Sequence, residues 1–141
     1  MKKEVLFQLI LITAILLTAV SCSSNVNPDW ISRAGLYADP AGTQPTDSYG
    51  WLDIFYLMIE LDNVPPDVVI RASWIAVDTN RLRPDTVIKI EEKEAKTSPL
   101  IFELENAGNF WPVGEYQVNI YVNDTPYQEI QFTVHDADVQ Y

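Results

Sequence analysis

After residue 50 the chain alternates between apolar and polar residues, and short polar segments interrupt this alternation. A period of two is typical of β-strands with one buried face, because successive side chains point to opposite sides. The predicted strands cover residues 51–62, 68–77, 86–92, 100–104, 115–122 and 130–134. No long helical pattern occurs in this part, so we expect an all-β sandwich or barrel.

The alternation also assigns an inward face to each predicted strand. We expect Trp74 and Tyr116 to lie in the core, because both share a face with aliphatic residues. In the strand over 86–92 we expect Ile88 and Ile90 to face inward and the charged residues between them to face solvent. The polar turn at residues 123–126 predicts a hairpin between the last two strands.

The last two predicted strands carry a recognisable pattern. It reads Gly-x-Tyr-x-Val at 114–118, Tyr-x-Asn-Asp at 121–124 and Phe-Thr-Val at 132–134. This resembles the end of bacterial immunoglobulin-like and fibronectin-III-like domains. The resemblance implies an immunoglobulin-like antiparallel β-sandwich of about seven strands over residues 50–135, with Tyr116 forming a tyrosine corner. The cysteine pair of antibody domains is absent, so the likeness concerns architecture only.

The N-terminal stretch has a different character. Lys2 and Lys3 precede a run of 16 mostly apolar residues, Val5 to Val20. The run is shorter than the roughly 20 apolar residues that span a bilayer. A charged start, a short apolar middle and a small residue at the exit are typical of a secretory signal peptide.

The stretch Leu16-Leu17-Thr18-Ala19-Val20-Ser21-Cys22 contains the single cysteine. It resembles the lipobox of bacterial lipoproteins, although Ala19 stands where the usual motif has leucine. The resemblance implies that residues 1–21 are cleaved and that Cys22 is diacylated on its sulfur and becomes the new N-terminus. The protein would then be anchored by lipid to a membrane, outside the cytoplasm, in a bacterial cell envelope. The alternatives are an ordinary signal peptide with a chance cysteine, or an uncleaved helix.

Between the anchor and the first firm strand lies a polar segment. Residues 22–49 are rich in Ser, Pro, Gly, Thr and Asp, and this composition is typical of a flexible tether. Within it, residues 30–37 could form a first edge strand. Residues 136–141 are expected to form a polar C-terminal tail.

Charge narrows the classes of partner. The chain has 9 Lys and Arg against 20 Asp and Glu, a net charge of −11, and removal of residues 1–21 leaves seven basic and nineteen acidic residues. Such a surplus argues against binding to nucleic acid, which needs a basic face. It also argues against broad contact with anionic lipid head groups. Basic partners and divalent cations remain compatible with it.

We expect no metal centre. His135 is the only histidine and Cys22 is the only cysteine, which argues against zinc. The oxygen-rich segments 62–63, 78–80 and 123–124 could bind calcium, but the same residue types make turns, and no spaced ligand loop is present.

We also expect no catalytic residues and no cofactor. The sequence has no nucleophile elbow and no glycine-rich phosphate loop. Glu60, Glu103 and Glu115 could pair as glycosidase carboxylates do, but nothing in the pattern brings two of them together. A small hydrolase is therefore the least favoured alternative.

Binding remains as the function class. Some aromatic residues fall on outward, edge or tether positions and are the candidate surface for a ligand or partner: Trp30, Tyr37, Trp51, Tyr56, Tyr121 and Tyr127. They could instead cover a second sheet face or hold the tether. The sequence thus predicts a lipid-anchored, non-catalytic binding or structural module. A carbohydrate-binding module is the alternative.

Overall fold

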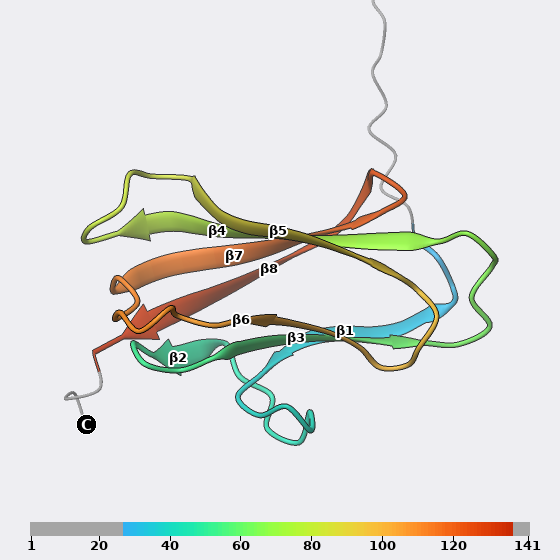
Figure 1. Ribbon diagram of the computed structural model, residues 1–141, viewed down its shortest axis with the longest axis horizontal. Coiled ribbons are helices and arrows are strands. Elements are labelled where there is room, and N and C mark those ends of the chain that lie inside the picture. The colour runs from blue at the N-terminus through green and yellow to red at the C-terminus, as the bar shows by residue number, and fades with distance from the viewer. Residues whose placement is uncertain (1–26, 137–141) are drawn as a thin grey trace, which may run out of the picture.

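The structure is a computed structural model that describes residues 27–136; the expected signal peptide over residues 1–21, Cys22 and residues 137–141 of the expected tail lie outside the described residues. Eight strands and no helix occur in this part of the chain (Figure 1). The strands are β1 Ile31–Tyr37, β2 Ser48–Gly50, β3 Phe55–Leu61, β4 Val69–Thr79, β5 Thr86–Glu94, β6 Leu100–Leu104, β7 Gly114–Val122 and β8 Thr125–His135. Accordingly, no segment between residues 27 and 136 is a helix able to cross a membrane.

The strands form two sheets packed as a sandwich, which confirms the all-β prediction. One sheet has the order β1-β3-β6 with antiparallel neighbours. The other has the order β2-β8-β7-β4-β5, and only its β2–β8 pair is parallel. Figure 1 shows the two layers running along the same long direction, with β1, β3 and β6 below β4, β5 and β7 in that view and the short strand β2 level with β3.

The core lies between the sheets and is rich in aromatic rings. Phe55 from β3 is fully buried, and its ring centroid lies 4.8 Å from that of Trp111 and 5.0 Å from that of Phe132. Trp74 and Tyr116 are also fully buried, as their alternation with polar residues predicts. Burying such rings contributes roughly 1.5–3 kcal/mol each, so the domain needs no disulfide to hold it together.

The segment expected to be a tether, with a possible first edge strand at residues 30–37, contains such a strand and also leads into a second one. Residues 31–37, within the segment expected to be a tether, form the edge strand β1 against β3, and residues 48–50 form β2. The intervening loop 38–47 lies on β3, where a Cβ on Gly42 would approach Met58 Sδ to 2.5 Å. Ser, Pro, Gly, Thr and Asp are common both in flexible tethers and in structured loops. The composition of residues 22–49 therefore cannot distinguish a tether from a structured loop.

Strand β5 departs from its predicted facing. Ile88 packs against the core as expected, but Ile90 is 58% exposed and Lys89 and Glu91 lie on the inward face. The pairing of β4 with β5 shifts at Trp74, where one extra residue of β5 is inserted. A one-residue shift moves every later side chain to the other face, so simple alternation gives the wrong side for Ile90.

The inward charges of β5 have partners at the margin of the sandwich. Lys89 Nζ donates to the backbone oxygen of Glu103 at 3.3 Å, and Lys93 Nζ donates to that of Ile101 at 2.5 Å. Both acceptors are on β6, the edge strand of the other sheet. The two lysines therefore bridge the sheets and cover an edge that would otherwise expose unpaired carbonyl groups.

The loops fall into two groups at opposite ends of the sandwich (Figure 1). The end where Asn27 enters, which we call the proximal end, has the loops at 62–68, 95–99 and 123–124. The other end, the distal end, has the loops at 51–54, 80–85 and 105–113 and the end of β8. The 11 residues of β4 run between the two ends, a length of about 35 Å.

Candidate binding surfaces

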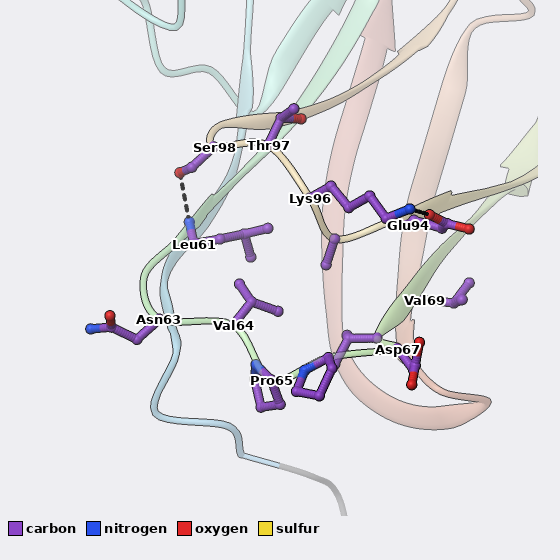
Figure 2. Close-up of a pocket in the computed structure, with 13 residues that line it drawn as sticks. Leu61, Asn63, Val64, Pro65, Asp67, Val69, Glu94, Lys96, Thr97 and Ser98 are labelled. Carbon is purple, nitrogen blue, oxygen red and sulfur yellow. Dashed lines mark hydrogen bonds and ion pairs between the residues drawn. The ribbon is translucent and has the colours of Figure 1, made fainter.

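A pocket opens at the proximal end, between the loop after β3 and the connection from β5 to β6 (Figure 2). Its volume is about 710 Å³. Both walls come from segments that prolines keep out of the sheets, since Pro65 and Pro66 lack the N–H needed for a ladder. We call it the proximal pocket. The residues that line it are Leu61, Asn63, Val64, Pro65, Pro66, Asp67, Val68, Val69, Glu94, Ala95, Lys96, Thr97 and Ser98.

The lining of the proximal pocket combines apolar side chains, some of them directed into the pocket, with nearly as many polar ones. Figure 2 shows Leu61 and Val64 directed into the pocket and Asn63 directed away from it. The Leu61 N–H donates to Ser98 Oγ at 2.9 Å, which ties the two walls together. At the rim Lys96 pairs with Glu94, so the lysine charge is already neutralised. The pocket suits a small apolar group and offers no free cation to an anion.

Two of the predicted surface aromatics are buried. Tyr37 and Tyr56 are 5% and 9% exposed, and with Met58 they form a small second core on the outer side of the three-stranded sheet. Tyr37 and Tyr56 therefore do not form a ligand surface. They cover the second face of the sheet, which was the alternative interpretation. Alternation alone could not reveal this, because it does not show which loop lies over an outward face.

The loop 38–47 that accompanies this second core is organised by one carboxylate. Asp39 accepts hydrogen bonds from the N–H of Gln44 at 2.8 Å and from the hydroxyl of Thr43 at 2.8 Å. Desolvation of the carboxyl raises its pKa, but these hydrogen bonds together outweigh it, so the pKa of Asp39 is lowered. The residues that look like tether thus form a hydrogen-bonded turn.

Three other predicted aromatics lie apart from each other. Trp30 and Tyr127 are half-buried and pack against the main core. Tyr121 lies on the outer face of the five-stranded sheet, where the Arg71 guanidinium sits 4.2 Å from its ring centroid. Arg71 also pairs with Asp124 in the hairpin turn. The Tyr121 ring is therefore already occupied by a cation–π contact within the chain.

Trp51 is the predicted aromatic that lies at an exposed end. It packs on Phe110, with ring centroids 4.6 Å apart and an angle of 32° between the rings. Phe110 is 50% exposed and neighbouring Leu52 is 64% exposed. The Trp111 N–H donates to the backbone oxygen of Trp51 at 2.8 Å, which fixes the two loops together. We call Trp51, Leu52 and Phe110 the distal surface.

The six predicted aromatics thus do not form one surface. The sequence analysis did not single out Leu52 and Phe110, although both are large apolar residues inside turn-rich segments, where no strand would bury them. A large apolar residue in a turn-rich segment is the sequence feature that could have identified them as exposed. Their proximity to Trp51 follows from long-range pairing and could not be read from spacing.

The oxygen-rich segments considered for calcium have other partners. Asn123 Oδ1 accepts the Val69 N–H at 2.9 Å, and Asp124 pairs with Arg71. Asn63 and Asn123 both have positive φ, as turn residues do. Within residues 27–136, no group of three or more His, Cys, Asp and Glu side chains is arranged to hold a metal ion.

The carboxylates considered for hydrolysis are not brought together. Glu60 on β3 pairs with Arg33 at 2.5 Å. Glu103 lies opposite Tyr56, four residues along β3 from Glu60. Glu115 lies on β7 in the other sheet. Glycosidase chemistry needs two carboxyl groups facing one cleft, whereas Glu60 and Glu103 lie four residues apart along one sheet and Glu115 lies in the other sheet.

One serine–histidine contact was not expected from the sequence. Ser48 Oγ lies 3.1 Å from His135 Nδ1, where β2 pairs with β8. Both side chains are exposed, and neither lines the proximal pocket. A catalytic pair also needs an orienting acid and donors for an oxyanion. We interpret this contact as a tie between the short edge strand and its neighbour.

Comparison with known proteins gives little beyond the fold. No model of a protein family matches the sequence, and no curated protein matches it. A solved structure with partial likeness is the Pseudomonas fluorescens alkylpurine DNA glycosylase AlkC bound to DNA containing an abasic site analog. The likeness has a TM-score of 0.43 at 13% identity and covers 72% of this chain but 30% of that one. At this level it concerns backbone shape alone.

Proposed function

We propose that this chain is a bacterial lipoprotein, anchored through Cys22 outside the cytoplasm, whose β-sandwich is a non-catalytic binding or structural module. The observation that carries the proposal is the lipobox-like stretch ending at Cys22, nine positions before the first residue of β1. Nine residues reach at most about 30 Å. A lipid on Cys22 would therefore hold the proximal end close to the membrane and direct the distal end away from it.

The strand arrangement supports an immunoglobulin-like topology for this module. The order β1-β3-β6 opposite β2-β8-β7-β4-β5 places the last two strands in the centre of one sheet, next to β4. Tyr116 at the start of β7 donates its hydroxyl to the backbone oxygen of Pro112 at 2.5 Å. This contact has the form of a tyrosine corner, in which the hydroxyl bonds backbone a few residues upstream.

Replacement of Cys22 tests the anchor. The variant Cys22→Ser keeps the size of the side chain but cannot form the thioether, so we expect the protein to leave the membrane fraction. A matched control is Ser23→Ala, which leaves the sulfur in place and should remain in the membrane. Unchanged fractionation of Cys22→Ser would contradict the proposal.

Carbohydrate recognition is a second candidate, and the pairing of Trp51 with Phe110 favours it. Phe110 is 50% exposed and Trp51 is half-buried, and a pair of rings on a fixed backbone at the surface is the kind of site on which a sugar ring can stack. Titration with glycans should then change the tryptophan fluorescence, and Trp51→Ala should abolish that change. A glycan array without binding, together with constant fluorescence, would exclude this candidate.

A further inference from the structure

Between residues 27 and 136 the basic side chains are paired with acids except at one place. The described residues contain seven Lys and Arg and eighteen Asp and Glu. Arg81 and Arg83 make no ion pair in this part of the chain, despite the surplus of acids and the nearby Asp78 and Asp85. The other five all lie within 4.0 Å of a carboxylate: Arg33, Arg71, Lys89, Lys93 and Lys96.

The two unpaired arginines lie beside the distal surface. They belong to the hairpin between β4 and β5, and both are exposed. Arg81 Nη2 donates to the backbone oxygen of Phe110 at 3.5 Å, which places this hairpin against the loop that carries Phe110. Leu82 between them is 37% exposed. The distal end therefore combines two exposed guanidinium groups that have no carboxylate partner among the described residues with the exposed side chains of Leu52, Leu82 and Phe110.

This combination selects the chemistry of a partner. A guanidinium binds carboxylates through two parallel hydrogen bonds and keeps its charge at any physiological pH. The apolar side chains beside it require apolar groups between the carboxylates of the partner. An anionic polysaccharide supplies charge without those apolar groups. Nucleic acid needs a continuous basic face, which two arginines do not make.

We propose that the distal end, through Arg81, Arg83, Leu82, Leu52 and Phe110, binds an acidic segment of another protein that carries aromatic or aliphatic side chains. This inference rests on the proposed function as a binding module and names the class of its partner. The orientation set by the lipid on Cys22 would present these residues away from the membrane.

The test uses the full chain purified from membranes in a nonionic detergent. The probe is a fluorescent synthetic peptide of alternating glutamate and phenylalanine, and its control has glutamine in place of glutamate. We expect the glutamate peptide to bind and the glutamine peptide to bind at least about tenfold more weakly, a difference of about 1.4 kcal/mol. Binding should weaken with added salt, because the arginines are exposed.

Variants assign the binding to the distal end. The double variant Arg81→Gln with Arg83→Gln and the single variant Phe110→Ala should each weaken peptide binding about tenfold or more. Arg33→Gln removes a charge on the edge strand β1 and should leave binding unchanged. Each variant should retain the urea midpoint of the parent, because the substituted side chains are exposed.

Several outcomes would overturn the inference. They are absence of peptide binding, equal binding by the double arginine variant, binding of dextran sulfate in preference to the peptide, and self-association that the arginine variants abolish. These results would leave the anchor intact, since membrane release of Cys22→Ser is measured separately. Conversely, an unlipidated Cys22 with normal peptide binding would contradict the anchor alone.

Discussion

Tyr116 shows how much a single residue contributes to this fold. Its ring is buried between the sheets, stacked 5.4 Å from Phe132, while its hydroxyl reaches the Pro112 carbonyl. Its position on a strand after Pro-Val-Gly made both its burial and its hydrogen bond predictable from the sequence. The ring thus packs in the core while the hydroxyl fixes the entry of the chain into β7.

The variant Tyr116→Phe should lower the free energy of unfolding by about 1 kcal/mol, because it removes one hydrogen bond and keeps the ring. Urea denaturation followed by tryptophan fluorescence measures this. Tyr121→Phe is the matched control, since the Tyr121 contact with Arg71 is made by the ring. Equal losses in the two variants would show that the Tyr116 hydroxyl has no special role.

Buried phenols also make stability depend on alkaline pH. Burial raises the pKa of Tyr116 to about 12 and raises that of Tyr49 as well. Because an unfolded tyrosine titrates near pH ~10, the stabilisation is complete below that pH and is lost as the pH rises from ~10 towards ~12. Urea midpoints between these pH values should fall, and they should fall less steeply for Tyr116→Phe. If the urea midpoint fell equally steeply with pH in the parent and in Tyr116→Phe, the buried Tyr116 phenol would not be the cause.

At the scale of elements, alternation predicted the central strands because each buries one face. The inward faces of β4, β6 and β7 follow period two without interruption over their buried residues. Strand β5 lies at the margin, where a bulge and two bridging lysines replace apolar burial, so its facing could not be derived. The conformation of the loop 38–47 could not be derived either. Hydrogen bonds from two turn residues to one carboxylate stabilise this loop, and no hydrophobic pattern marks it in the sequence.

Gly114 is the point where β7 approaches the end of β4 most closely. Its φ is +148°, and a Cβ there would lie 2.1 Å from the backbone oxygen of Asp78. Gly114→Ala should therefore destabilise the fold by about 3 kcal/mol or more, because backbone atoms cannot move aside easily.

Gly108→Ala is the control: φ is also positive, +85°, but nothing lies within 4 Å. It should cost only about 1 kcal/mol. Thermal unfolding of both variants compares them, and similar losses would contradict the contact.

At the scale of the whole molecule, the two ends of the sandwich have different roles in the proposed function. The sequence predicts an anchor and a set of surface aromatics, but it could not show which loops share an end. That grouping depends on the order of strands, which brings residues 51–52, 81–83 and 105–113 together. The sequence alone therefore could not assign Leu52, Arg81 and Arg83 to one surface.

The orientation on the membrane can be measured by attaching a fluorophore to either end. Because Cys22, the proposed lipidation site, is the single cysteine, the label is placed by an unnatural amino acid at Asn63 or at Leu52 in the full chain. Lipids that carry a quencher should quench the label at Asn63 strongly and the label at Leu52 weakly, since the ends are about 35 Å apart. Equal quenching, or the reverse order, would contradict the orientation.

The anchor on Cys22 is the claim on which the orientation and the exposed distal end depend. Mass spectrometry of the N-terminal peptide from the native membrane protein tests it most directly. We expect a chain that begins at Cys22 and carries a diacylglyceryl group on its sulfur. A peptide that begins at Met1, or an unmodified Cys22 thiol in the mature protein, would contradict the account.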